Sequence, residues 1–339
     1  MRKIKNALCL ILCLTGLISL FSCAKPESKS PKTRTFYTYF DTVGTFYDYT
    51  GGSEKKFEAL ADRVELSLRE YHRLFDIYRE YEGVTNLATL NRTAGEGAQR
   101  VDKKIIDLLL FSKEMYTLTS GKVNVAMGAV LSIWHDYRTE GKSIPPMDML
   151  LEAAKHTDIN SLIIDEENLT VELLDPKMSL DVGAIAKGYA VEMVAKMLEA
   201  EGKSGYILDV GRNLRTIGKK PSGDGWTAGV VNPLDQLSNY VYIMKLKGEA
   251  LVTSGTYERF YTVDGVRYHH IINGDTLMPE NYYLSVSVKS PSSALSDALS
   301  TAIFNMKYAE ARSFVESMDR LFVVLVLPSG EVVTLGKDF

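Results

Sequence analysis

The chain has 339 residues and a formal net charge of −4, and 45% of its residues are hydrophobic. This length supplies the core of one large domain or of two intimate subdomains. The mildly acidic balance, without a basic tract, argues against a nucleic-acid-binding protein.

The N-terminus has the pattern of an export signal. Three basic residues among the first five precede an apolar run over residues 7–20, which is too short to cross a membrane comfortably. The run ends at Ser22-Cys23, and a small residue before a cysteine resembles the lipobox of bacterial lipoproteins. We therefore expect residues 1–22 to be a signal peptide and Cys23 to be lipidated. An ordinary cleaved signal with an incidental cysteine is the alternative.

Cysteine usage and composition agree with export. The chain has three cysteines, two of which lie inside the predicted signal. The mature protein therefore lacks the thiols for a disulfide, a thiolate metal site or a cysteine nucleophile. Residues 23–35 are mostly polar and predict a flexible tether between the lipid and a folded domain over 36–339. We expect an exported protein, lipid-anchored to a bacterial membrane on its periplasmic or extracytoplasmic face.

The predicted elements mix helices and strands without strict alternation. Residues 36–49 are rich in Tyr, Phe and Thr, which is typical of a strand, and apolar residues at helical spacing predict a helix over 54–75. Further helices are expected at 102–119, 147–155, 184–200 and 293–305. Further strands are expected at 161–164, 169–174, 206–210, 226–231, 240–246, 250–253, 282–288, 321–327 and 332–335. This mixture favours an α+β fold with mixed or antiparallel sheets and packed helices.

Asp181 to Gly188 joins a short apolar stretch to a predicted helix. Backbone amides at a helix N-terminus bind phosphate, Gly183 would let a ligand approach the main chain, and Lys187 would add a positive charge. A tight turn with a solvated lysine is the alternative, since one glycine-bearing turn is a weak signal. The segment is neither GxGxxG nor a Walker sequence, so a Rossmann or P-loop enzyme is not expected.

The segment from Thr253 to Thr256 offers hydroxyls and amides around Gly255, and His269-His270 follows. Adjacent residues on a strand face opposite sides, so the two histidines are not expected to share a metal ion. His270 is a candidate base or phosphate ligand, and one buried and one exposed histidine is the alternative. The sequence has no GxSxG elbow, so a serine hydrolase is not expected.

Asp297 and Thr301 lie four residues apart on the predicted helix over 293–305, so their side chains share one face. A carboxylate and a hydroxyl are hard oxygen donors of the kind that Mg²⁺ prefers. Taken alone, a polar stripe on a surface helix is the simpler explanation. The helix is otherwise largely apolar, which predicts burial, and a buried aspartate needs a partner. This favours a metal site.

These segments occur together, and the chain resembles the ApbE family of FAD:protein FMN transferases from about Thr38 to Met306. The resemblance is carried by Phe40–Thr45, Leu90-Asn91, Asp181–Gly188, Asp209–Leu214, Trp226–Pro233, Thr253–Arg259, His269–Ile272 and Asp297–Thr301. It implies an ApbE-like fold of two intimate subdomains. It also implies a transferase that binds FAD and uses Mg²⁺ to pass FMN to a Ser or Thr hydroxyl of an exported acceptor protein, releasing AMP. Subunits of membrane redox complexes are such acceptors.

The resemblance also implies roles for individual residues. The metal ligands would be Asp297, Thr301 and a backbone carbonyl of the Gly183-Ala184 turn, assigned to Ala184. His270 would be the catalytic helper, together with Lys187. The residues expected around the flavin and its phosphates are Val43, Tyr78, Asn91, Asp181, Lys187, Thr253, Gly255, Thr256 and His270.

The chain departs from the family pattern at several positions. Arg212 stands where the family often has glycine, Asn124 and Asn273 where it often has aspartate, and Val43 where it has methionine. Arg212 is expected to add a phosphate contact, and Asn273 weakens the case for an acid–base role at its position. Because the metal pair and the lysine turn are intact, we expect activity to be retained. The alternatives are an FAD pyrophosphatase, a non-catalytic flavin-binding lipoprotein and a lipoprotein that binds another solute.

Overall fold

The structure is a computed structural model that describes residues 30–40, 42–235 and 239–339. The predicted signal peptide, Cys23 and most of the predicted tether lie outside the described residues. The chain from Lys32 to Phe339 forms one folded unit, and its first strand begins at Lys32. The last residues of the predicted tether therefore belong to the fold. Within the described ranges, no helix combines the length and the apolar composition needed to span a bilayer.

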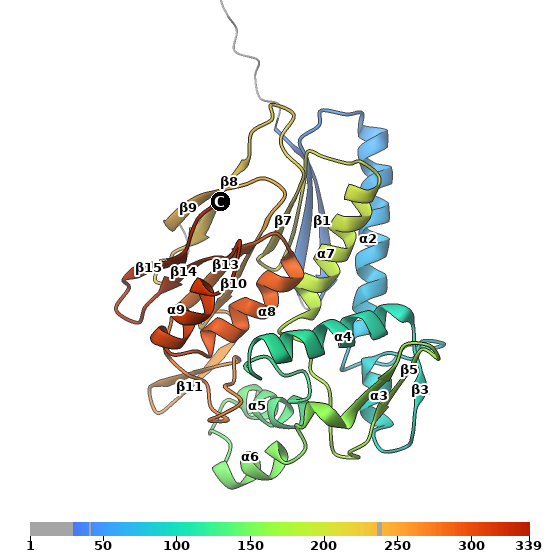
Figure 1. The fold of residues 1–339 in the computed structure, drawn as a ribbon, viewed down its shortest axis with the longest axis vertical. Helices are drawn as coiled ribbons and strands as arrows, with labels where there is room; N and C mark the ends of the chain where they lie inside the picture. The colour runs from blue at the N-terminus through green and yellow to red at the C-terminus, as the bar shows by residue number, and fades with distance from the viewer. Residues whose placement is uncertain (1–29, 41, 236–238) are drawn as a thin grey trace, which may run out of the picture. The chain divides into compact units, whose positions relative to one another are not determined.

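An antiparallel sheet lies at the centre of the folded unit (Figure 1). In the described chain it has eight strands in the order β1-β2-β6-β7-β10-β13-β14-β15, with every neighbouring pair antiparallel. They are β1 (Lys32–Tyr39), β2 (Thr42–Asp48), β6 (Tyr206–Val210), β7 (Asn213–Ile217), β10 (Ala250–Gly255), β13 (Ser285–Ser290), β14 (Phe322–Val326) and β15 (Val332–Gly336). The prediction of one strand over 36–49 is wrong, because the chain turns at Phe40, whose φ is 53°, and β1 pairs with β2.

Helices α2 (Glu54–Phe75), α7 (Ala186–Ala200) and α8 (Ser293–Phe304) pack against the sheet on one side (Figure 1). The helical spacing of apolar residues in α2 holds to its last residue: the buried apolar residues from Phe57 to Leu68 pack against β1, β2 and α7, and Leu74 and Phe75 join the larger core cluster. Phe57 of α2 stacks on Phe46 of β2 with ring centroids 6.1 Å apart. α7 and α8 contact each other over the middle strands, which brings the start of α7 against α8.

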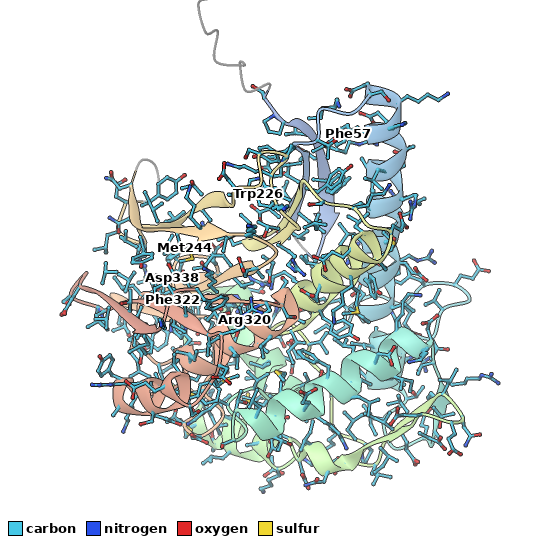
Figure 2. The ribbon with its side chains drawn as sticks, turned by 45° about the horizontal axis from the view of Figure 1, so that its top comes forward. Phe57, Trp226, Met244, Arg320, Phe322 and Asp338 are labelled. Atoms are coloured by element: carbon cyan, nitrogen blue, oxygen red, sulfur yellow. The ribbon has the colours of Figure 1, made fainter. Side chains whose placement is uncertain are left out.

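The hairpin of β8 (Trp226–Val231) and β9 (Tyr240–Leu246) packs on another part of the sheet. Met244 of this hairpin joins an apolar cluster with Leu251 and Phe322 of the sheet strands (Figure 2). Leu251 belongs to β10, where successive side chains alternate between the two faces. The hairpin therefore covers the face of β10 that α8 does not cover.

The remaining elements complete the described fold. They are α3 (Leu87–Arg92), β3 (Gln99–Arg100), α4 (Lys103–Leu118), α5 (Gly128–Glu140), α6 (Met147–Ala154), the 3₁₀ helix η1 (Ile159–Ser161), β4 (Leu162–Asp165), β5 (Thr170–Leu173), β11 (Phe260–Val263), β12 (Val266–His269) and α9 (Tyr308–Glu316). The hairpin predicted over 161–174 is confirmed by the pairing of β4 with β5. Helices packed on antiparallel sheets confirm the α+β prediction.

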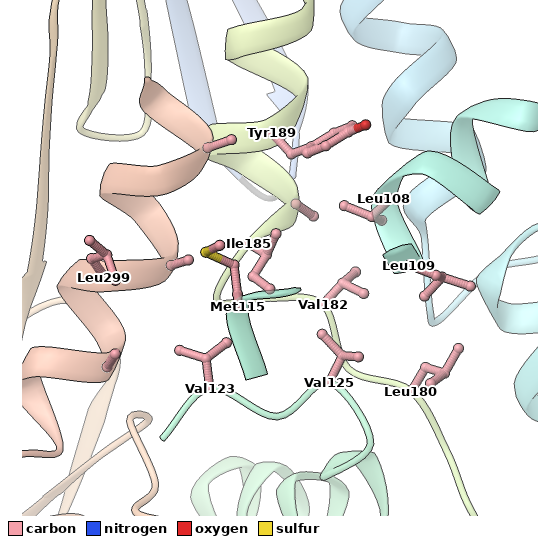
Figure 3. Close-up of a cluster of buried hydrophobic side chains, with 14 of the residues drawn as sticks. Leu108, Leu109, Met115, Val123, Val125, Leu180, Val182, Ile185, Tyr189 and Leu299 are labelled. Carbon is pink, nitrogen blue, oxygen red and sulfur yellow. The ribbon is translucent and has the colours of Figure 1, made fainter. Parts of the chain in front are cut away.

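The core reaches the segment that precedes α7 (Figure 3). Leu180, Val182 and Ile185 are buried in a core cluster that also contains side chains of α4 and α8. Because these three residues point inward, the Gly183-Ala184 pair is left on the outer side of the turn. Packing of the hydrophobic residues therefore fixes which atoms of this turn face solvent.

Candidate active site

α7 and α8 meet at Gly188 and Asp297. The Gly188 N–H donates to Asp297 Oδ2 over 2.8 Å, and a Cβ at Gly188 would lie only 2.4 Å from the Asp297 Cβ. Asp297 is 4% exposed. The first N–H groups of a helix lack intrahelical partners, so the carboxylate caps α7 from a neighbouring helix. A buried carboxylate is thereby held at the start of α7.

The Ala184 carbonyl lies in the turn just before this capped helix. The carbonyls of Val182 and Ile185 accept backbone N–H groups from four residues further along the chain. Among the described residues, the Ala184 carbonyl accepts no backbone donor. Its donor would be the Gly188 N–H, which points to Asp297 instead. A backbone carbonyl without a backbone donor offers the oxygen ligand that a hard cation takes.

Lys187 links the carboxylate to the glycine turn. Its Nζ lies 3.9 Å from Asp297 Oδ2 and donates to the Gly183 carbonyl over 3.4 Å. Burial raises the pKa of Asp297, and the positive charge of Lys187 opposes that rise. The Lys187 side chain keeps 19% of its surface exposed, so part of it is accessible to a bound anion.

Thr301 follows Asp297 by one turn of α8 and is half-buried. Contacts between α7 and α8 recur every four residues, because the Ser293 N–H donates to Glu192 one turn before Asp297 meets Gly188. One further turn along this line leads to Thr301 on α8 and to Ala184, two residues before the start of α7. The described residues contain no cluster of three or more His, Cys, Asp or Glu side chains. The predicted ligand set of Asp297, Thr301 and the Ala184 carbonyl contains one carboxylate and is therefore not a cluster of that kind.

Asn91 and Asp181 shape the turn from both sides. Asn91 Nδ2 donates to the Leu180 carbonyl over 3.0 Å, and the Leu180 N–H donates to Asn91 Oδ1 over 2.7 Å. Asp181 Oδ1 accepts the Gly183 N–H over 2.8 Å. Burial raises the pKa of Asp181, while this hydrogen bond and nearby cations, among them Arg259, oppose the rise. Both residues therefore hold the glycine turn in place.

Helix α5 brings an arginine and a histidine that are absent from the predicted site residues. Arg138 Nη2 lies 3.3 Å from His135 Nδ1, and the His135 ring lies 5.7 Å from the Tyr78 ring, between centroids. Burial and the charge of Arg259 lower the pKa of the Arg138 guanidinium. Within the described chain, no carboxylate lies in salt-bridge range of Arg138 or Arg259. Cations without matching carboxylates favour an anionic ligand.

His269 and His270 face opposite sides, as the strand alternation predicts. His269 is buried. Its Nε2 donates to the Glu280 carbonyl over 3.0 Å, and its Nδ1 accepts the Ile271 N–H over 3.2 Å. His270 Nδ1 lies 3.2 Å from the Arg259 carbonyl. A carbonyl only accepts, so this contact assigns the proton to Nδ1 and leaves the Nε2 lone pair of His270 free. Burial, followed by the charge of Arg259, lowers the pKa of His270 to about 3.

The residues 253–256 do not act as one group. The Thr253 hydroxyl hydrogen-bonds Ser287 over 2.7 Å, whereas Ser254 hydrogen-bonds Ser300 of α8 over 2.8 Å. Because β10 alternates, Thr253 faces away from α8 and from Asp297. The Thr256 N–H donates to the Leu284 carbonyl over 3.0 Å, and Thr256 is buried. Hydroxyls that are neighbours in the sequence, such as those of Thr253 and Ser254, therefore lie on opposite faces of β10.

Arg212 and Gly255 meet around the ring of Tyr257. Arg212 Nη1 donates to the Tyr257 hydroxyl over 2.7 Å, and its Nε lies 2.7 Å from Glu258 Oε1. A Cβ at Gly255 would lie 2.6 Å from the same ring. The guanidinium expected to contact phosphate is thus paired with Glu258. Val43 lies at the other side of the β6–β7 turn, where its carbonyl accepts the Gly211 N–H over 3.1 Å and its side chain is exposed.

The fold and this site define an α+β protein with a buried carboxylate, a lysine and unpaired arginines near the meeting point of two helices, a combination suited to an anionic ligand. The particular family follows from comparison: the model of the ApbE family matches residues 43–325. The chain belongs to this family. Membership makes the chain a transferase.

Relatives and solved structures agree. A FAD:protein FMN transferase of Klebsiella pneumoniae is 30% identical over 78% of this chain and 82% of its own length. One of Treponema pallidum is 30% identical over 73% of this chain and 72% of its own length. The ApbE protein of Thermotoga maritima superposes with a TM-score of 0.80 at 24% identity, covering 90% of this chain and 97% of that one. The flavin transferase ApbE of Vibrio cholerae gives a TM-score of 0.75 at 23% identity, with 90% and 98% covered.

Proposed function

We propose that the protein transfers FMN from FAD to a Ser or Thr hydroxyl of an exported acceptor protein in a Mg²⁺-dependent reaction that releases AMP. Family membership supports flavin transfer. The observation that carries the finer proposal is that Asp297 Oδ2 accepts the Gly188 N–H and lies 3.9 Å from Lys187 Nζ, which donates to the Gly183 carbonyl. We also propose that residues 1–22 direct export and that lipidated Cys23 anchors the protein to the membrane that holds the acceptor.

Oxygen atoms at the meeting point of α7 and α8 fit Mg²⁺. Asp297, Thr301 and the Ala184 carbonyl would hold the ion, because Mg²⁺ takes oxygen ligands and the Ala184 carbonyl lacks a backbone donor among the described residues. Bound there, Mg²⁺ would supply positive charge for the oxygens of the FAD pyrophosphate. Lys187, whose partly exposed side chain lies beside Asp297, would add a second positive charge.

His270 would take the proton of the acceptor hydroxyl. As the hydroxyl oxygen bonds to the phosphorus of the FMN half, the bond from that phosphorus to the bridging oxygen breaks, and AMP leaves with the electron pair. The hydroxyl proton goes to His270 Nε2, which is unprotonated because Nδ1 donates to the Arg259 carbonyl. The carbonyl therefore orients the base as well as fixing its tautomer.

Replacing His270 with glutamine will lower the rate of flavin transfer by roughly 10²- to 10⁴-fold, the usual contribution of a positioned base. FAD binding will change little, because glutamine fills similar space and retains polar atoms. The measurement is single-turnover transfer of FMN to an acceptor, with FAD affinity determined by flavin fluorescence. A His269→Gln variant is the matched control. His269 is buried against Phe304, so this variant should lose stability and keep the catalytic base. A normal transfer rate in His270→Gln would exclude the base assignment.

The pH profile follows from the lowered pKa of His270, about 3 against the ordinary 6.5. The folded protein keeps His270 neutral, and its Nε2 able to accept a proton, at every pH well above that value. kcat/KM for FAD, which reports on the free enzyme, will therefore show no acid limb near pH 6.5 from this residue. Stability behaves differently: the unfolded chain gains a proton below 6.5 that the folded one refuses, so His270 costs stability as pH falls from 6.5 toward 3. Urea unfolding of the wild type and His270→Gln across this range measures that difference.

The proposed function is tested by mixing the full chain with FAD, Mg²⁺ and an exported redox-complex subunit. Mass spectrometry then reports FMN on the acceptor, and chromatography reports AMP. FMN attached to a Ser or Thr together with one AMP per transfer supports the proposal. AMP with only free FMN would identify an FAD pyrophosphatase, and bound FAD without AMP would identify a flavin-binding lipoprotein. Absence of FAD binding would indicate a different solute.

A further inference from the structure

Glu192 is a buried carboxylate on α7 that none of the roles above uses. It is 2% exposed, and its Oε2 accepts two hydrogen bonds. One comes from the backbone N–H of Ser293, at the first residue of α8, over 2.7 Å, and the other from Arg215 Nε over 3.0 Å. Glu192 therefore ties the start of α8 to the middle of α7.

Arg215 fixes this carboxylate to the sheet. It belongs to β7 and is buried, and its Nη1 donates to the carbonyls of Thr216 and Gly248, the latter over 3.0 Å. Its Nη2 lies 3.1 Å from Glu199 of α7. A buried carboxylate and guanidinium satisfied in this way are held in one geometry. Glu192 thus has a fixed position relative to both the sheet and α7.

The hydrogen bond between Glu192 and Ser293 fixes the position of α8 along the axis of α7. The next contact, one helical turn away on each helix, is the pair of Gly188 and Asp297. Four residues of α-helix advance by about 6 Å. A shift of α8 that breaks the Ser293 contact must therefore also move Asp297 away from the Ala184 turn.

We propose that Glu192 is a positioning residue, which holds the start of α8 so that Asp297 and Thr301 meet the Ala184 carbonyl around the cation. The proposal rests on the proposed Mg²⁺ site. Buried ion pairs add little net stability compared with apolar residues of similar volume. The directional hydrogen bond from the Ser293 N–H to Glu192 fixes the register between α7 and α8, which apolar packing alone does not do.

The experiment compares four variants of the full-length chain. Glu192→Leu removes the acceptor of the Ser293 N–H. Glu192→Leu with Arg215→Met removes the same acceptor but leaves no unpaired buried charge. Glu192→Gln keeps an acceptor oxygen, and Glu199→Gln is the matched control, because Glu199 contacts Arg215 without contacting α8. Mn²⁺ binding followed by electron paramagnetic resonance, with and without FAD, is the main readout. FAD affinity and thermal unfolding are measured alongside.

The proposal expects Mn²⁺ affinity to fall by about 10- to 100-fold in Glu192→Leu, as for other residues that orient metal ligands. The double variant recovers thermal stability but keeps the weak Mn²⁺ binding, while the two glutamine variants bind Mn²⁺ nearly as the wild type does. FAD affinity in the absence of metal stays unchanged.

Recovery of Mn²⁺ affinity together with stability in the double variant would show a purely structural role and overturn the proposal. Unchanged affinity in a folded Glu192→Leu would do the same while leaving the Mg²⁺ site intact. If Glu192→Leu does not fold, the double variant and Glu192→Gln decide the matter. A wild type that binds no Mn²⁺ with FAD would overturn the metal site itself and, with it, this role.

Discussion

Asp297→Asn will abolish Mg²⁺-dependent release of AMP while leaving the protein folded. The amide is isosteric with the carboxylate, and its oxygen can still accept the Gly188 N–H that Asp297 Oδ2 accepts over 2.8 Å. What the variant loses is the negative charge. A metal ion contributes several kcal/mol of charge stabilisation, so a drop of at least about a hundredfold is expected at any Mg²⁺ concentration near the wild-type requirement. AMP release measured over a Mg²⁺ titration checks this.

Thermal unfolding separates loss of the metal from loss of the fold. Burial raises the pKa of Asp297, which means that its ionised form is held at a cost in the folded state. Removing that charge should therefore leave the unfolding temperature of Asp297→Asn unchanged or raise it. Ser300→Ala is the control on the same helix, because Ser300 hydrogen-bonds Ser254 of β10 and does not face α7. Metal-dependent turnover by Asp297→Asn at the wild-type rate would remove Asp297 from the site.

Periodic burial explains which elements the sequence predicts well. In α2 and α4 each buried residue recurs at helical spacing, and Asp102 caps α4 by accepting the Lys104 N–H over 2.8 Å. The bounds of β6, β8 and β9 agree with the predicted strands to the residue. In each case the pattern that stabilises the element is local. Such a local pattern can be recognised in a single sequence.

α5 was missed although a signal was present. Val130 and Trp134 lie four residues apart and are both buried, which is helical spacing. Few other positions of the helix are buried, so the periodic pattern is short. The omission mattered, because α5 carries His135 and Arg138 to the site. Strand β10 gave the opposite error: residues adjacent in the sequence were grouped, yet Thr253 and Ser254 lie on opposite faces.

The pairing of α7 with α8 depends on contacts that no local pattern contains. Gly188 and Asp297 are 109 residues apart, and their hydrogen bond exists only because both helices pack on the same sheet. Spacing within each helix can place Asp297 above Thr301, or Lys187 one turn after Gly183, but not one helix against the other. The resemblance to a family supplied that step at the sequence level. The structure adds the physical reason, which is a glycine that lets the helices touch.

Gly188→Ala will destabilise the protein and reduce flavin transfer, although alanine is the better helix former. In an open helix this change gains about 1 kcal/mol of helix propensity. Here the added Cβ would lie 2.4 Å from both the Asp297 Cβ and the Ser293 carbonyl, where ordinary contacts begin at 3.4 Å. The helices must therefore separate by about 1 Å, and overpacking of this kind costs about 1–3 kcal/mol. The steric cost exceeds the propensity gain.

Activity should respond more strongly to Gly188→Ala than stability does, because the separation moves Asp297 away from the Ala184 turn. A misplacement of about 1 Å can cost about 100-fold in rate. Gly52→Ala is the control, since its Cβ would meet only the Thr50 hydroxyl, at 3.3 Å, and should change neither quantity much. Urea unfolding and AMP release measure the two effects. A Gly188→Ala variant more stable than the wild type, with normal turnover, would mean that α7 and α8 do not pack as closely at Gly188 and Asp297 as this geometry requires.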